Sequence, residues 1–254
     1  MHNRLEKEKA FHNEAFSTGI RKPLDAYYSI FGAIRKEFRN RLRTYAVSKD
    51  ALECGCGVNS YATELAPYLG QLNGIDISDE AVRQSVEMAK SKGLANCEFD
   101  VMNAEQLGFT DQSFDLLFGV GIIHHLDLPV FYSEASRVLK PSGKMMFMEP
   151  LGYNPFINLY RKLTPKMRTP DEHPLLRKDL RLINDYFDEL KISYYHFFTL
   201  LAVPFRNTKV FNPFLKCLQS LDNFMFKFVP GFKYLAWYVI IEAGSPKQKR
   251  PSIM

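Results

Sequence analysis

The sequence predicts an α/β protein built on a doubly wound, mostly parallel sheet. A short run ending at Leu52 fits a buried strand, and it leads into a turn with two glycines and then a helical segment at 61–69. A second strand, 72–76, follows this helix and ends in an acid, Asp76. Further strands follow in order up to about residue 150. Strand, glycine turn and helix is the layout of nucleotide-binding sheets.

The glycine turn limits the class of ligand. Gly55 and Gly57 let the backbone turn tightly and let a ligand approach without a Cβ in the way. A dinucleotide loop would need a third glycine where Ser60 stands, and no Gly-Lys-Ser/Thr phosphate loop is present. Glu53, two residues before the first glycine, opposes a pyrophosphate and suits a cationic ligand.

Three segments together resemble class I S-adenosylmethionine (SAM)-dependent methyltransferases. Glu53–Asn59 resembles their first motif, with Asn59 at its last glycine. Residues 113–126, which include Phe-Asp and His-His-Leu, resemble the fourth motif of the ubiquinone-methyltransferase-like subgroup, and 139–144 resembles its Leu-Lys-Pro-Gly-Gly turn. The resemblance covers about residues 50–150. It implies a Rossmann-like seven-stranded sheet with helices on both faces, in which the last strand enters antiparallel between the fifth and sixth.

On this interpretation the chain has five parts within one fold. We expect an N-terminal helical lid at 1–46, a SAM-binding core at 47–150 and an acceptor-binding insertion at 151–232 that includes the sixth strand. A final strand at 233–245 and a disordered tail at 246–254 complete the chain. No internal repeat or low-complexity linker separates these parts.

Hydrophobic periodicity places the remaining elements. Apolar residues three or four apart predict a helix over 31–45, whose basic face is either solvated or attracts an acidic substrate or anionic lipid. The expected strands after the second are 97–101, 113–119, 145–148 and 189–196. The expected later helices are 78–92, 129–139, 175–187 and 210–228. The wide apolar stripe of 210–228 fits a packed core, an apolar acceptor pocket or a shallow membrane contact.

The resemblance also implies a set of cofactor-binding residues. Glu53 would orient SAM and favour its cationic end, and Asp76 would accept hydrogen bonds from both ribose hydroxyls, as acids do at this place in NAD folds. Asn103 stands where the family has an acid at the adenine, and a simple turn is its alternative role. The full expected set is Glu53, Gly55, Cys56, Gly57, Asp76, Ile77, Asn103, Ala104, Glu105, Gly119 and Val120.

Candidates for catalysis lie at two places. His124 and His125 follow the fourth strand, where ligands of an open sheet bind, so either could act as a general base or could pack locally. Glu172 and His173 lie on a loop before a helix and are second candidates, with helix capping as the alternative. The residues expected to contact the acceptor are Tyr27, Tyr28 and Glu149.

The function predicted is methyl transfer from SAM, giving S-adenosylhomocysteine (SAH), to a small apolar or amphipathic acceptor. A lipid, isoprenoid, quinone, polyketide or sugar-lipid intermediate all fit, and the methylated atom stays open. A non-catalytic SAM-binding or interaction protein is the alternative, because Asn59 and Asn103 depart from the family pattern. Glu53 and the missing third glycine argue against the function of a nicotinamide oxidoreductase.

Composition agrees with a globular enzyme and excludes other classes. The chain has 254 residues, 46% hydrophobic and 24% charged, with a net charge of +5 that does not argue for nucleic acid. No basic-aromatic RNA module is recognisable.

The four cysteines form no disulfide framework, and Cys54-x-Cys56 lacks zinc spacing, so we expect no metal. This cysteine usage favours a reducing cytosol, so we expect a cytoplasmic protein. The start lacks an apolar signal core, and without an 18-residue apolar stretch we expect no spanning helix. Peripheral membrane contact and oligomeric state, monomer or homodimer, stay open.

Overall fold

The computed structural model describes residues 2–18, 25–58, 60–165 and 172–247, which contain a seven-stranded sheet of order β3-β2-β1-β4-β5-β7-β6. Strands β1 to β5 are parallel, and β7 runs antiparallel between β5 and β6. This confirms the predicted mixed sheet, including the place of its last strand. The strands are β1 (Asp50–Cys54), β2 (Gln71–Asp76), β3 (Cys97–Val101), β4 (Phe114–Val120), β5 (Leu139–Pro150), β6 (Phe187–Tyr195) and β7 (Tyr238–Pro246).

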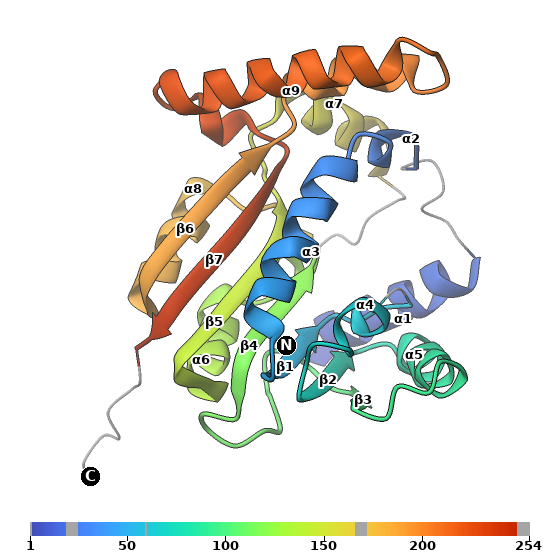
Figure 1. The fold of residues 1–254 in the computed structure, drawn as a ribbon, viewed down its shortest axis with the longest axis vertical. Coiled ribbons are helices and arrows are strands. Elements are labelled where there is room, and N and C mark those ends of the chain that lie inside the picture. Colours follow the sequence, from blue (N-terminus) through green and yellow to red (C-terminus); the bar gives the residue numbers. More distant parts are fainter. Residues whose placement is uncertain (1, 19–24, 59, 166–171, 248–254) are drawn as a thin grey trace.

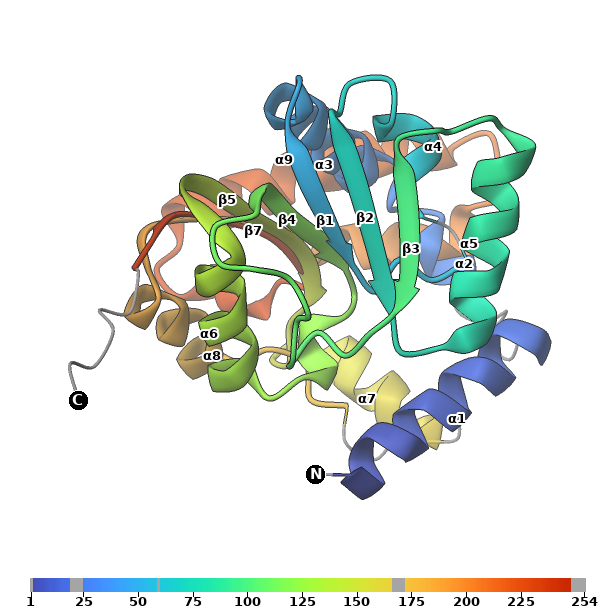
Figure 2. The same cartoon turned by 90° about the horizontal axis from the view of Figure 1, so that it is seen from below.

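Helices cover both faces of the sheet (Figure 1 and Figure 2). One face packs against α3 (Gly32–Ala46), α4 (Ala62–Leu65) and α5 (Asp79–Ser91), and the other against α6 (Leu128–Val138) and α8 (Arg177–Leu182). The remaining helices are α1 (His2–Thr18), α2 (Asp25–Tyr28), α7 (Pro155–Leu163) and α9 (Phe211–Phe228). Short 3-10 turns are η2 (Ile123–His125), η4 (Ile183–Asp185), η5 (Phe198–Phe205) and η6 (Phe232–Leu235).

The middle residues of the central strands β4 and β5 are nearly all apolar, because both faces of these strands are buried. In β4, Leu116 and Phe118 point to the α3 side, whereas Leu117 points to the α6 side, and all three are fully buried. In β5, Met146 and Phe147 divide between the two sides in the same way. This double coverage explains why these strands show continuous apolar runs rather than alternation.

The helix predicted at 61–69 is shorter in the structure. The α4 helix ends at Leu65, and Pro67 follows two residues later. Proline has no N–H and cannot donate to the previous turn, so the regular hydrogen bonding ends here although Ala66 keeps helical angles. The Ser60 hydroxyl accepts a hydrogen bond from the Ala62 amide, as the predicted cap would. Asn59, the other predicted cap, lies outside the described residues.

Other boundaries also differ from the predictions. The turn expected at 139–144 lies inside β5 as an irregularity, since Phe114 and Leu116 of β4 pair with Leu139 and Lys144. The helix expected at 175–187 divides into α8 and η4. The β7 strand extends to Pro246, and residues 248–254 of the predicted tail lie outside the described residues.

Gly119 has a packing role between β1 and β5. A Cβ at this position would lie 2.5 Å from the Cys54 carbonyl oxygen and 2.7 Å from the Phe147 ring. We therefore expect Gly119→Ala to lower the free energy of unfolding by about 1–3 kcal/mol, as measured by urea denaturation. Gly108→Ala is the control, since its Cβ would meet only the end of Met102 at 3.4 Å. Equal midpoints for the two variants would contradict this packing role.

Candidate functional site

A cavity of about 670 Å³ opens at the carboxyl ends of β1, β2 and β4. The sheet order reverses at β1, which lies between β2 and β4, and open α/β sheets bind ligands at such a point. The volume falls within the range for drug-sized ligands. Beyond the sheet edge, the lining comes from α1, α2, α3 and α7 and from the start of β7.

The glycine turn forms one wall of the cavity. Gly55 and Gly57 have φ values of 68° and 53°, a region that favours glycine. The Gly55 and Cys56 amides donate to the Ile75 carbonyl at 2.8 and 3.0 Å, which fixes the turn against the end of β2. A ligand can therefore lie against this backbone without meeting side chains at the two glycines.

Glu53 is buried beneath the turn and connects it to the helix that follows. Its Oε2 accepts from the Ser60 hydroxyl at 2.5 Å, and its Oε1 accepts from the Tyr61 amide at 3.0 Å. Burial raises the pKa of Glu53 to about 7, although these hydrogen bonds lower it. Since Glu53 also lines the cavity, a cationic ligand there would favour its ionised form.

Asp76 ends β2 beside the glycine turn. Its Oδ2 accepts from the Gly57 amide at 3.0 Å, and its Oδ1 accepts from the Ser78 amide at 2.9 Å. A carboxylate can accept about four hydrogen bonds, which is enough for these two amides and the two hydroxyls of a ribose. The amides hold both oxygens in fixed positions at the cavity wall.

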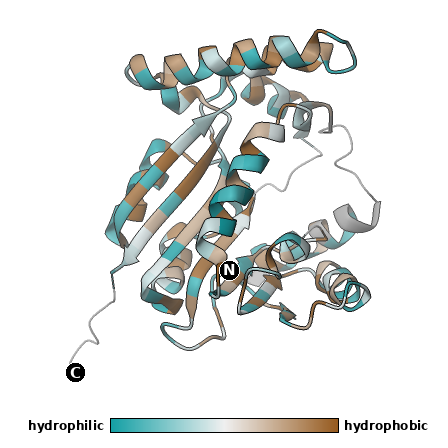
Figure 3. Cartoon of the chain, viewed as in Figure 1, coloured by the Kyte–Doolittle hydropathy of each residue, from teal (hydrophilic) through white to brown (hydrophobic). Residues whose placement is uncertain are grey.

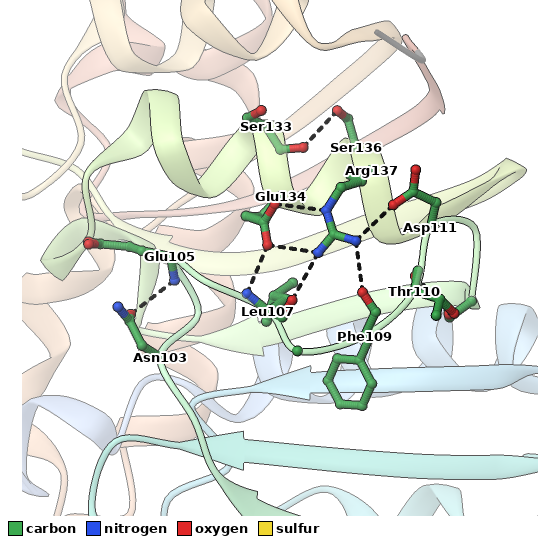
Figure 4. A network of polar contacts seen from close by, with 12 residues as sticks. Asn103, Glu105, Leu107, Phe109, Thr110, Asp111, Ser133, Glu134, Ser136 and Arg137 are labelled. Carbon is green, nitrogen blue, oxygen red and sulfur yellow. Dashed lines mark hydrogen bonds and ion pairs between the residues drawn. The ribbon is translucent and has the colours of Figure 1, made fainter. Parts of the chain in front are cut away.

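The loop after β3 is held by a network from α6 (Figure 4). Glu134 accepts from the Leu107 amide at 2.8 Å, and Arg137 donates to the Leu107 and Phe109 carbonyls at 2.9 and 2.7 Å. Hydrogen bonding from Arg137 lowers the pKa of Glu134, so the pair stays ionised. The network fixes the backbone of the segment that presents Asn103 and Ala104 to the cavity.

Asn103 also has a local role within this loop. Its side-chain oxygen accepts from the Glu105 amide at 2.9 Å, as in a turn. Glu105 lies outside the cavity lining, and its carboxylate accepts from Arg4 of α1 and from the Asp127 amide. Glu105 therefore connects α1 to the start of α6, and it does not face a ligand in the cavity as we expected.

Two histidines and two glutamates meet at the end of β4. His124 Nδ1 lies 2.7 Å from Glu149 Oε2, and its Nε2 lies 4.0 Å from Glu172 Oε1. Glu149 Oε1 accepts from the Ile122 and Ile123 amides at 2.9 and 3.1 Å. Burial raises the pKa of Glu149 to about 7. Glu149 is fully buried and lies outside the cavity lining, so it cannot contact an acceptor as we expected. Its contact is with His124.

The other two candidates in this region have different surroundings. His125 lines the cavity, and its Nδ1 lies 3.5 Å from Glu8 of α1. The His173 side chain is exposed and outside the lining, while its backbone amide donates to the His124 carbonyl at 3.0 Å. His173 thus supports the His124 backbone and does not face the cavity.

Aromatic side chains from distant parts of the chain build the far end of the cavity. Tyr27 of α2 lies 4.9 Å from Tyr160 of α7 and 6.0 Å from Trp237, measured between ring centroids. Phe31 contacts Trp237 at 5.1 Å, and the Arg35 guanidinium lies 5.4 Å from the Tyr28 ring. This end can hold an apolar body, with a cation at its edge.

Most of the predicted site residues come together in this one cavity. Those that line it are Tyr27, Tyr28, Glu53, Gly55, Cys56, Gly57, Asp76, Ile77, Asn103, Ala104, Val120, His124, His125 and Glu172. Those that do not are Glu105, Gly119, Glu149 and His173.

Several lining residues were not predicted, and some had a signal in the sequence. Arg161 and Tyr160 come from α7, whose start is marked by Asn154-Pro155: the Asn154 side chain accepts from the Ile157 amide at 3.1 Å. Arg4 and Glu8 come from α1, where no comparable local pattern was recognised.

One group of lining residues has the composition of a metal site. Among the described residues, His124, His125 and Glu172 each offer a ligand atom, and these atoms lie within 4.8 Å of one another. The hydrogen bond from His124 to Glu149 would orient the ring for such a role as well as for proton transfer. This composition bears on the expectation that the protein needs no metal, which removal of metal ions would test.

The strand order and the glycine turn at the end of β1 define the class I methyltransferase fold. Residues 52–147 match the family model described as a methyltransferase domain.

Similar proteins include an uncharacterized methyltransferase, YcgJ of Bacillus subtilis, at 32% identity over 39% of this chain and 39% of that protein. The demethylmenaquinone methyltransferase of Geobacillus kaustophilus is 33% identical over 40% of this chain and 45% of that protein. The matches thus span less than half of each relative. Among solved structures, phosphoethanolamine N-methyltransferase 2 of Haemonchus contortus has a TM-score of 0.64 at 18% identity, covering 93% of this chain and 60% of that one. That likeness concerns the fold.

Proposed function

We propose that the chain transfers a methyl group from SAM to a small apolar or amphipathic acceptor, with His124 as general base. One observation carries the proposal: a single cavity joins the glycine turn and Asp76 to His124 and to an aromatic end. The methyltransferase-domain match supports the same reaction class.

The described residues fit SAM at the sheet end of the cavity. The left-handed glycines allow close approach, Asp76 suits a ribose diol, and the buried Glu53 favours a cation. Asn103 and Ala104 would lie along the adenine, and Val120 along the methionine part. Bound SAM would supply a methyl group on a sulfonium as the electrophile.

The chain's own residues would orient the acceptor and remove its proton. Ionised Glu149 accepts the Nδ1 hydrogen of His124, so the neutral imidazole carries its lone pair on Nε2. Nε2 lies on the side of Glu172, which also lines the cavity. A hydroxyl, amine or acidic carbon held there would lose its proton to Nε2, while the aromatic end excludes water and fixes the acceptor in line.

The acceptor end favours an apolar or amphipathic molecule. Tyr27, Tyr160 and Trp237 form its walls, and Arg35 and Arg161 offer positive charge to an anionic group. The match to a demethylmenaquinone methyltransferase supports a quinone among the candidates, together with lipids, isoprenoids, polyketides and sugar-lipids. We retain the lid role of 1–46 and the acceptor-binding role of 151–232 as parts of this proposal.

The test is acceptor-dependent SAH formation by the purified chain over a panel of quinones, phenols, isoprenoids and lipid-linked sugars. We expect turnover with at least one apolar acceptor, and loss of about 10²–10⁴-fold in His124→Ala. His173→Ala is the matched control and should keep full activity. Activity should also survive EDTA, because the proposed mechanism uses no metal ion. SAM binding without any turnover would support the non-catalytic alternative, and loss with EDTA would assign the histidine cluster to a cation.

A further inference from the structure

The α9 helix has one wide apolar face, which is buried along one edge and exposed along the other. The buried edge packs Phe214, Leu218 and other residues onto the body of the protein. Along the exposed edge, which we call the outer stripe, Leu221, Phe224 and Phe228 are 40%, 57% and 60% exposed. A surface helix normally exposes polar side chains. The outer stripe therefore indicates that α9 contacts a second apolar surface, outside the body of the protein.

The exposed apolar surface continues onto neighbouring elements. Leu159 and Leu163 of α7 are 59% and 73% exposed, and Leu201 of η5 is 51% exposed. Ring contacts connect these elements: Phe156 of α7 lies 5.8 Å from Phe197, Phe197 lies 4.8 Å from Phe232, and Phe226 of α9 lies 5.9 Å from Phe232. Figure 1 shows α9 across one end of the molecule above α7, and Figure 3 shows its apolar positions. We call the exposed residues of α7, η5 and α9 the end face.

A buried carboxylate fixes α9 to the rest of the chain. Asp222, on the inner side of the helix, accepts from the Phe197, Phe198 and Thr199 amides at 3.1, 2.7 and 3.3 Å. These hydrogen bonds fix the orientation of α9, so Phe224 and Phe228 stay on its exposed side.

The charged side chains at the surface of residues 197–233 are all basic. Residues 197–233 contain one acid, the buried Asp222, and five cations: Arg206, Lys209, Lys216, Lys227 and Lys233. Lys216 and Lys227 are exposed on α9 beside the apolar stripe. Aromatic and leucine side chains flanked by lysines are the composition of a helix that lies in the interface of an anionic membrane.

We propose that the end face docks on an anionic lipid bilayer, with α9 lying in the plane of its surface. None of the described helices has the length and hydropathy of a membrane span. A second copy of the chain fits less well, because a two-fold interface centred on α9 would bring its cations against one another.

The end face lies next to the acceptor end of the cavity. In α7, Ile157 and Tyr160 line the cavity, whereas Leu159 and Leu163 are exposed. Docking would therefore bring the aromatic end close to the bilayer, from which an apolar acceptor could enter. This last step rests on the proposed function, whereas the docking itself does not.

The experiment is flotation of the full chain with vesicles of phosphatidylcholine, alone or mixed with phosphatidylglycerol. We expect binding to the anionic vesicles that weakens with added salt. The variant Leu221→Ser, Phe224→Ser, Phe228→Ser should bind more than about tenfold more weakly, and Lys216→Glu with Lys227→Glu, which reverses two charges, should lose more than roughly 30-fold. Val101→Ser and Lys90→Glu, exposed positions on β3 and α5, are the matched controls.

Every variant is also melted with SAH, which separates the two proposals. A retained SAH shift with lost flotation supports the docking face, and flotation without any SAH shift overturns only the proposed function. Absent flotation by the wild type, or equal binding to neutral and anionic vesicles, would overturn the docking proposal. So would a dimer in sedimentation that the Leu221, Phe224, Phe228 variant abolishes, because the face would then belong to a second copy.

Discussion

Glu149→Gln is expected to lower kcat by about 10²–10⁴-fold and to leave the SAH dissociation constant unchanged. Glu149 touches no part of the cavity, but it accepts the Nδ1 hydrogen of His124 and two backbone amides. A glutamine oxygen can still accept from the Ile122 and Ile123 amides, whereas its NH₂ group would donate to Nδ1. That exchange moves the histidine proton to Nε2, where the base is needed.

The pH dependence distinguishes this positioning role from a purely structural one. Since burial raises the pKa of Glu149 to about 7, wild-type kcat should rise as the pH passes through that region. Glu149→Gln should flatten this rise, because glutamine does not titrate. A stopped assay of SAH formation from pH 5.5 to 9 checks both points. An unchanged kcat, or an unchanged pH profile at reduced kcat, would exclude the proposed control of the His124 tautomer.

The raised pKa values of Glu53 and Glu149 also predict how stability varies with pH. Both pKa values are about 7 in the folded chain, above the ordinary glutamate value of 4.5. Their contribution to stability is therefore full below the unfolded pKa and is lost as the pH rises through about 7. The free energy of unfolding of Glu149→Gln should lack part of this decline, which urea denaturation across that pH range can measure.

Asp76→Ala is expected to weaken SAH binding by about 100-fold, or about 3 kcal/mol. Asp76 offers both carboxylate oxygens at the end of β2, and the Gly57 and Ser78 amides hold them in place. Removing the carboxylate deletes the proposed ribose contacts and releases the glycine turn. Calorimetric titration with SAH measures the loss.

Two further variants support the interpretation of this result. Asp76→Asn keeps the size of the side chain and one acceptor oxygen, so its affinity should lie between those of wild type and Asp76→Ala. Asp100→Ala removes an exposed acid from the neighbouring strand, outside the cavity, and should bind SAH normally. Normal SAH affinity in a folded Asp76→Ala protein would place the cofactor elsewhere.

The features predicted correctly from sequence are those set by neighbouring residues. The strand end at Asp76, the glycine turn and the place of the last strand follow from local patterns and from the family resemblance, whereas the first strand runs to Cys54, two residues beyond the predicted end. Asp76 and Gly57 are separated by one helix and one strand, so parallel pairing brings them together. This part of the site needed no long-range information.

The roles that depend on distant contacts could not be predicted in this way. Glu149 meets His124 only because β5 ends beside the turn after β4, and Glu105 meets Arg4 only because α1 folds across the loop. Periodicity likewise showed that α9 is apolar, but not that one edge of its apolar face is buried and the other exposed. Only the packing of Asp222 and its neighbours decides which apolar residues point outward.

The most direct test of the central claim is a thermal melt of the purified chain with SAM, SAH and NAD in turn. At about 100 times the dissociation constant, a ligand adds ~2.7 kcal/mol, or roughly 5–10 °C in Tm for a domain of this size. We expect this shift with SAM and SAH and none with NAD. A shift with NAD alone, or no shift with any of the three in a folded chain, would contradict the assignment of the cavity to SAM.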